Sequence, residues 1–98
     1  MPKIYVPHVP SRYDSTVKAW VPTVDLSKAE RFGEIVVLLK PDTYRLAISQ
    51  LIPGMKEKMR DFGPADYIVA LGDPSIIAAA AMIGSSMNGG KILMLKWD

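Results

Sequence analysis

The sequence has 98 residues, of which 49% are hydrophobic, and its 12 Lys+Arg and 10 Asp+Glu leave a formal charge of +2. This length suits one domain with an apolar core, which excludes an intrinsically disordered chain. Cysteine is absent, so disulfides, cysteine-ligated zinc and thiol nucleophiles are excluded. The single histidine, His8, cannot form a multi-histidine metal site within one chain.

Residues 1–33 form an arm rich in proline. Ile4-Tyr5-Val6 predicts a short strand, and we expect Pro7 and Pro10 to prevent its extension as a central strand. Turn-forming residues near the middle of this arm predict a small hairpin from Arg12 to Val21.

A short helix is expected at the end of the arm, over Leu26–Phe32. Asp25 is a plausible N-cap for it, while Ser27 and Glu30 offer a competing capping box. Gly33 would end the helix.

The rest of the chain carries three continuous apolar runs, at residues 34–39, 66–71 and 91–95. None of them alternates polar with apolar residues. Each run therefore predicts a strand that is covered on both faces, as in a parallel sheet.

Helical patterns separate these strands. Residues 42–62 have apolar side chains at helical spacing with Asp42 as a possible cap, and Pro53-Gly54 predicts a kink or two short helices. The last helix begins at Asp73-Pro74, an N-cap followed by a first-turn proline, and ends at Asn88-Gly89.

Strands that alternate with helices across short joins predict parallel pairing through right-handed crossovers. The expected fold class is therefore α/β: a small three-layer Rossmann-like unit with a mostly parallel sheet of three or four strands. Residues 1–98 would form a single domain, with a strand and hairpin arm over 1–33 and the strand-helix-strand-helix-strand unit over 34–98.

The crevice beyond the carboxyl ends of the strands is the usual ligand position in such a sheet. Gly72, Asp73 and Ser75 follow the strand predicted at residues 66–71, and Lys40 follows the strand predicted at residues 34–39. These four residues are therefore the candidate ligand-binding residues. In the alternative interpretation the role of Asp73 is structural. Its carboxylate caps the last helix, and its negative charge would repel a phosphate. No dinucleotide or P-loop glycine pattern is present.

The last helix has no charged residue and only Ser85 and Ser86 as polar residues between Ile76 and Met87. A helix that is apolar all round must be covered on two sides. We therefore expect self-association, with a symmetric dimer favoured. The candidate interface residues are Ile76, Ala80, Ile83, Gly84 and Met87.

Other chemistry is not favoured. No catalytic set can be assembled around His8, so no enzyme activity, cofactor or metal site is predicted. Residues 56–61 alternate in charge, which indicates a solvated helix face. The basic and aromatic residues between Arg12 and Trp20 are too few, at a net charge of +2, to favour nucleic-acid binding. No apolar run approaches the length of a membrane helix, and the expected location is cytoplasmic.

Several strings spread along the chain resemble small bacteriophage proteins of unknown function, and this resemblance implies a viral source, hence the host cytoplasm, but no activity. Two functions stay open. The first is a non-enzymatic binding or interaction protein that self-associates, with a protein among its possible partners. The second is a nucleotide- or phosphometabolite-binding domain that uses the Gly-Asp-Pro-Ser loop. The strings that carry the resemblance are Tyr5-Val6-Pro7-His8-Val9-Pro10, Phe32-Gly33-Glu34, Gly72-Asp73-Pro74, Asn88-Gly89-Gly90-Lys91 and Leu95-Lys96-Trp97-Asp98.

Overall fold

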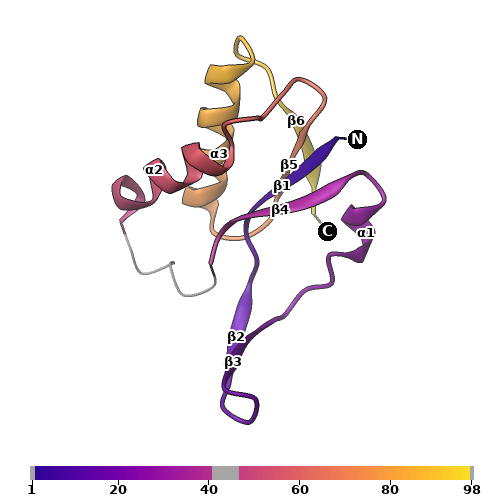
Figure 1. Ribbon diagram of the computed structural model, residues 1–98, viewed down its shortest axis with the longest axis vertical. Coiled ribbons are helices and arrows are strands. Elements are labelled where there is room, and N and C mark those ends of the chain that lie inside the picture. The colour runs from indigo at the N-terminus through magenta and orange to yellow at the C-terminus, as the bar shows by residue number, and fades with distance from the viewer. Residues whose placement is uncertain (1, 41–46, 98) are drawn as a thin grey trace.

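A computed structural model describes residues 2–40 and 47–97, and its centre is a four-stranded parallel sheet in the order β4-β1-β5-β6 (Figure 1). In this sheet Tyr5 pairs with Val36 on one side and with Ile68 on the other, and Ile68 pairs with Met94. The predicted α/β class with a parallel sheet is confirmed. The strands are β1 (Lys3–His8), β4 (Glu34–Leu39), β5 (Tyr67–Ala70) and β6 (Leu93–Lys96).

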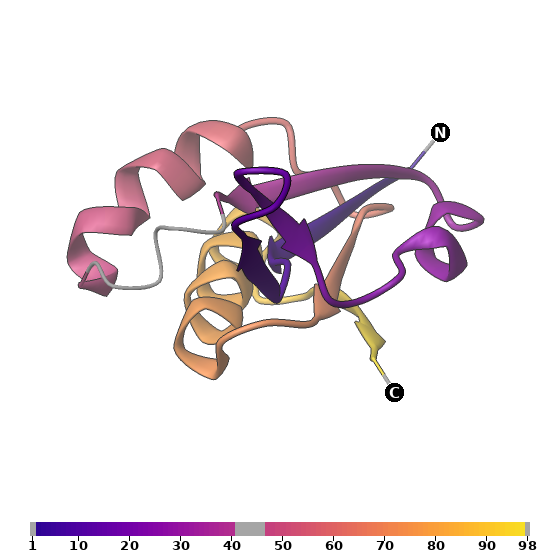
Figure 2. The same ribbon diagram turned by 90° about the horizontal axis from the view of Figure 1, so that it is seen from below.

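Three helices cover the two faces unequally: α1 (Ser27–Glu30), α2 (Ile48–Lys58) and α3 (Pro74–Met87). In this strand order, the connection from β1 to β4 crosses the sheet in one direction. The connections from β4 to β5 and from β5 to β6 cross it in the opposite direction. Right-handed crossovers that step in opposite directions lie on opposite faces. Accordingly α2 and α3 cover one face, while only the four-residue α1 covers the other (Figure 2).

The core on the α2/α3 face is the larger one, because two full helices bury their apolar side chains there. Tyr5 and Phe62 meet edge to face, with their ring centroids 5.3 Å apart. α3 packs closely against Phe62 at Gly84, because a Cβ added at this glycine would lie only 2.9 Å from Cε2 of Phe62. The buried members of this cluster are Tyr5, Leu38, Leu39, Leu51, Met55, Met59, Phe62, Ile68, Ile76, Ala79, Ala80 and Ile83.

The core on the α1 face is smaller, and Ala29 is the only buried residue that α1 itself contributes. The N-cap residue of α1 is Leu26 and no side chain caps the helix, so the expected cap at Asp25 and the alternative capping box at Ser27 and Glu30 are both wrong. Asp25 lies one residue before the N-cap, where its Oδ1 accepts the backbone N–H of Ser27 at 2.9 Å. The buried residues on this face are Ile4, Val6, Val9, Ala29, Val69 and Leu71.

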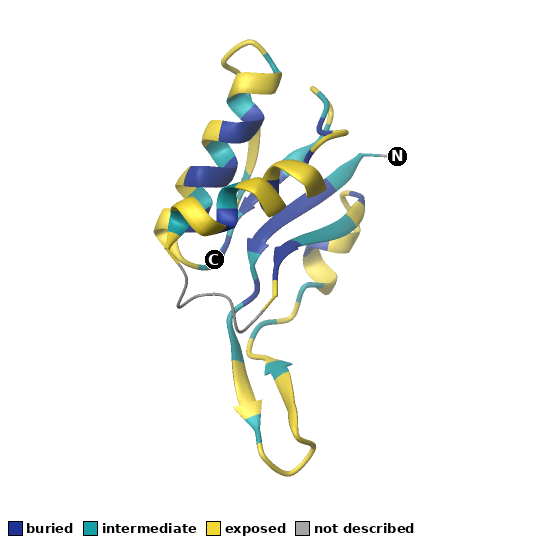
Figure 3. Cartoon of the chain, turned by 60° about the vertical axis from the view of Figure 1, so that its left-hand side comes forward, coloured by how far each residue is buried: buried dark blue, intermediate teal, exposed yellow. Residues whose placement is uncertain are grey.

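The predicted hairpin is confirmed as β2 (Ser11–Asp14) and β3 (Ala19–Pro22), which extend beyond the carboxyl end of β1 (Figures 1 and 3). Asp14 accepts the N–H of Thr16 at 2.8 Å within the turn. Tyr13 and Trp20 pair across the strands with ring centroids 5.8 Å apart. Most residues of the hairpin are exposed, so it stands away from the core.

One expectation about the arm is wrong, since β1 is a central strand that includes Pro7. The ladder tolerates the missing N–H because neither neighbour pairs with Pro7. β4 pairs with Val6 and His8 on either side of it, and β5 pairs only with Ile4 and Tyr5.

Two further expectations need correction. α2 is one helix from Ile48 to Lys58 with Pro53 inside it, so the alternative of two short helices is wrong. The expected Asp42 cap lies outside the described residues. β6 is not covered on both faces, because it is an edge strand whose Leu93 and Met94 are 42% and 41% exposed.

Candidate functional site

The predicted ligand loop lies at the carboxyl edge of the sheet, where β5 ends beside β1. Gly72 has a φ of +106°, and a Cβ on it would lie 2.5 Å from the carbonyl oxygen of His8. Only glycine avoids both the positive φ and this contact. The glycine therefore has a structural role in seating the end of β5 against β1.

Asp73 caps α3, as the structural alternative predicted. Its Oδ1 accepts the backbone N–H of Ser75 at 2.8 Å and also the Ser75 hydroxyl. These hydrogen bonds, the hydroxyl one first, lower the pKa of the Asp73 carboxyl, and the nearby His8 lowers it slightly further. The carboxylate and the hydroxyl that were expected to bind a ligand are thus engaged with each other.

Strand order decides which residues meet at this edge. Leu39 of β4 pairs with His8 of β1, so Lys40 follows β4 on the far side of β1 from Asp73. His8, which sequence reasoning treated as an isolated residue, is the one that lies beside the Gly72–Asp73 turn. Its position depends on β1 being a central strand, which the prolines argued against.

A cavity of about 650 Å³ lies elsewhere, on the α1 face of β5 and β6. Its walls come from the segment around α1 and from the end of β6. Sequence reasoning missed it because Arg31-Phe32 and Lys96-Trp97 are far apart in the chain and carry no shared motif. The lining residues are Val24, Asp25, Lys28, Ala29, Arg31, Phe32, Val69, Leu95, Lys96 and Trp97.

The predicted interface residues lie mostly inside the chain's own core. Ile76, Ala80 and Ile83 are at most 5% exposed, and Gly84 is buried against Phe62. These four positions form the face of α3 that packs on the sheet and α2, so a partner cannot reach them in the folded chain. Met87 alone is exposed, at 41%.

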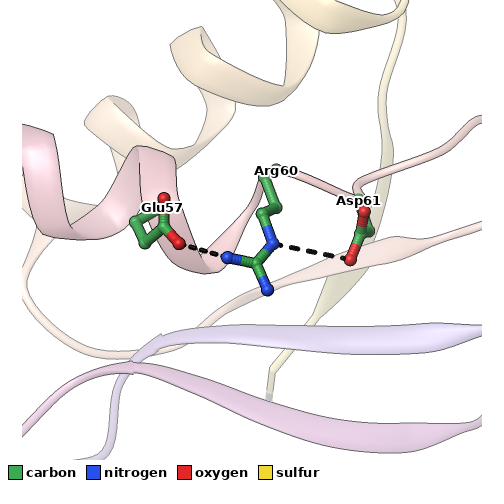
Figure 4. Close-up of polar contacts among 3 residues, drawn as sticks. All are labelled: Glu57, Arg60 and Asp61. Atoms are coloured by element: carbon green, nitrogen blue, oxygen red, sulfur yellow. Dashed lines mark hydrogen bonds and ion pairs between the residues drawn. The ribbon is translucent and has the colours of Figure 1, made fainter.

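The charged residues at the end of α2 form a solvated surface, as the alternating pattern predicted. Arg60 pairs with Glu57 and, at 3.9 Å between Nε and Oδ2, with Asp61 (Figure 4). All three side chains are exposed, and exposed pairs of this kind contribute little to stability.

Within residues 2–40 and 47–97, no helix is long and apolar enough to cross a membrane. Over the same ranges, no three His, Asp or Glu side chains gather as they would around a metal ion.

Fold and surface together define a small doubly wound α/β protein with one well-covered face and one thinly covered face that holds a cavity. The chain belongs to the Phage Pam3 gp32-like protein family, whose family model matches residues 2–98. The resemblance to bacteriophage proteins is thereby confirmed. No curated protein and no solved structure matches the chain significantly.

Proposed function

We propose that this phage-family protein is a non-enzymatic interaction protein that self-associates through the outer face of α3. The observation that carries the proposal is the chemistry of that face. α3 has no charged residue over its fourteen positions, and Met82 on its outer side is 64% exposed. A solvent-facing helix normally carries charged side chains on this side, whereas the exposed polar residues of α3 are the small Ser75 and Ser86.

A second copy of the chain is the occupant that this surface suits. Ala78 is exposed beside Met82, and Ala81 is half-buried next to them. Small side chains let two helices approach closely, and a two-fold axis would bring the same face of each copy together. Met94 of the edge strand adds exposed apolar surface on the same side of the sheet, since it alternates with Ile92, which packs against the α2/α3 core.

The burial pattern determines which substitution can test this proposal. Ala80→Glu is unsuitable, because Ala80 is 0% exposed and a carboxylate there would disrupt the core. Met82→Glu instead places the charge on the proposed contact surface without entering the core. Val17→Glu is the matched control, since Val17 is 61% exposed on the hairpin turn.

Size-exclusion chromatography with light scattering at micromolar concentration gives the readout. We expect a dimer for the wild type and for Val17→Glu, and a monomer for Met82→Glu. Circular dichroism and thermal melting check that both variants remain folded. A monomeric wild type, or a folded Met82→Glu variant that keeps the wild-type mass, would contradict the proposal.

A further inference from the structure

Over the part of the chain that the structure describes, no helix covers the portion of the α1 face beyond α1. α1 is only four residues long, and its buried Ala29 packs with Ile4 and Val6 of β1 and with Val69 of β5. Beyond it, towards β6, the sheet forms the floor of the cavity through Val69 and Leu95. At about 650 Å³ the cavity falls within the range of roughly 300–1,000 Å³ that is typical of small-molecule sites.

Two aromatic residues line this cavity. Phe32 follows α1 and is 40% exposed, and Trp97 follows β6. With Val24 and Leu95 they provide apolar surface suited to a flat ring. Base–aromatic stacking typically contributes about 1–3 kcal/mol per base.

The rim of the cavity is positively charged. Among the residues that the structure describes, Lys28, Arg31 and Lys96 line it together with one carboxylate, that of Asp25. The pKa of Asp25 is lowered, chiefly by the hydrogen bond from the backbone N–H of Ser27, so this carboxylate is ionised at neutral pH and already has a partner. The guanidinium carbon of Arg31 lies 5.0 Å from the centroid of the Phe32 ring, which places charge next to apolar surface.

We propose that this cavity binds a small aromatic anion of mononucleotide size. The ring would lie against the Phe32 and Trp97 surfaces, and the anionic group would face Lys28 and Arg31. Among the described residues neither of these two cations forms an ion pair, and the Asp25 carboxylate, whose charge interacts with that of Lys28, accepts the backbone N–H of Ser27. This site is separate from the Gly72–Ser75 loop and from the outer face of α3.

The test uses the fluorescence of Trp97. The chain has two tryptophans, and Trp20→Phe leaves Trp97 as the only one while keeping an aromatic partner for Tyr13 on the hairpin. In this background AMP, GMP, CMP and UMP are titrated to about 10 mM at low salt. We expect saturable quenching by at least one of them, with a Kd below about 1 mM.

Two comparison ligands separate the parts of the proposal. Adenosine keeps a base without the phosphate, and inorganic phosphate keeps the anion without a ring. Both should bind at least tenfold more weakly than the best mononucleotide. Equal binding by adenosine would overturn the role of the cations, and equal competition by phosphate would overturn the role of the aromatic residues.

Variants locate the site. The double substitution Lys28→Gln with Arg31→Gln should raise the Kd at least tenfold. Lys56→Gln, an exposed change on α2 at the other face, should leave it unchanged. Both lysines and Arg31 are exposed, so the fold should survive, as circular dichroism can verify. Absence of saturable quenching by all four nucleotides, or an unchanged Kd in the folded double variant, refutes the assignment. Neither result depends on the oligomeric state.

Discussion

Replacement of Gly72 by alanine should destabilise the fold strongly, because this residue has a positive φ and no room for a side chain. Its φ is +106°, a conformation that L-residues rarely adopt. The added Cβ would lie 2.5 Å from the carbonyl oxygen of His8 and 2.9 Å from the His8 Cβ. Since both contacts involve the backbone or Cβ of β1, no side-chain rotation can relieve them.

The expected magnitude combines three contributions. A residue held in a sparsely populated φ/ψ region costs of order 1–3 kcal/mol. Overpacking against atoms that cannot move freely costs about 1–3 kcal/mol more. Alanine also restricts the unfolded chain, which offsets about 0.4–1 kcal/mol. The net loss in the free energy of unfolding should be about 1–5 kcal/mol, which for a chain of this length lowers Tm by at least about 4 °C.

Urea denaturation followed by circular dichroism measures this loss directly. The matched control is Gly54→Ala, because Gly54 lies within α2 and a Cβ there would meet nothing within 4 Å. Alanine inside a helix is favoured over glycine by roughly 0.5–1 kcal/mol, so this variant should gain stability. A Gly72→Ala variant within about 0.5 kcal/mol of the wild type, or an equal loss of stability in the two variants, would contradict this prediction.

Two further predictions concern the start of β1. Asp66 accepts the N–H of Lys3 and the N–H of Gly63, both at 2.8 Å. Asp66→Ala should therefore lower the free energy of unfolding, measured by urea denaturation, by about 2–3 kcal/mol, and Asp66→Asn should lower it less because it keeps one acceptor oxygen. Equal losses in the two variants would argue against the role of these hydrogen bonds. Burial, aided by the nearby acidic side chains, raises the pKa of Tyr5 above its ordinary 10.0. The contribution of the neutral Tyr5 side chain to stability is therefore complete below the pKa of Tyr5 in the unfolded chain. This contribution is lost as the pH rises through the pKa of Tyr5 in the folded protein. The free energy of unfolding should fall above pH 10, less steeply in Tyr5→Phe; identical slopes would refute this.

The elements that local sequence signals determine were predictable. The apolar run Glu34–Leu39 matches β4 at both ends, and Asp73-Pro74 and Asn88 mark the beginning and end of α3. The hairpin was predictable as well, because Asp14 supplies its turn through a contact two residues away. In each case the residues that determine the structure are close neighbours in the chain.

The features that depend on strand order were not predictable. Pro7 is compatible with a central strand because neither β4 nor β5 pairs with it, which no local pattern reveals. The apolar run at β6 looked like a buried strand, yet its place at the sheet edge leaves Leu93 exposed. The cavity likewise exists because the fold brings Phe32 and Trp97, which are far apart in the chain, to the same pocket on the α1 face.

The central position of β1 has a consequence for how the chain folds. Tyr5 of β1 pairs with Val36 and Ile68, which are both far from it in the sequence. The two strands of the β2–β3 hairpin are instead close neighbours in the sequence. Contacts between distant residues form slowly, because the loop entropy is lost before the contact stabilises anything. We therefore expect the hairpin to form early and the sheet to close late. β1, which precedes the other described strands in the chain, therefore acquires its second neighbour only after distant segments have come together.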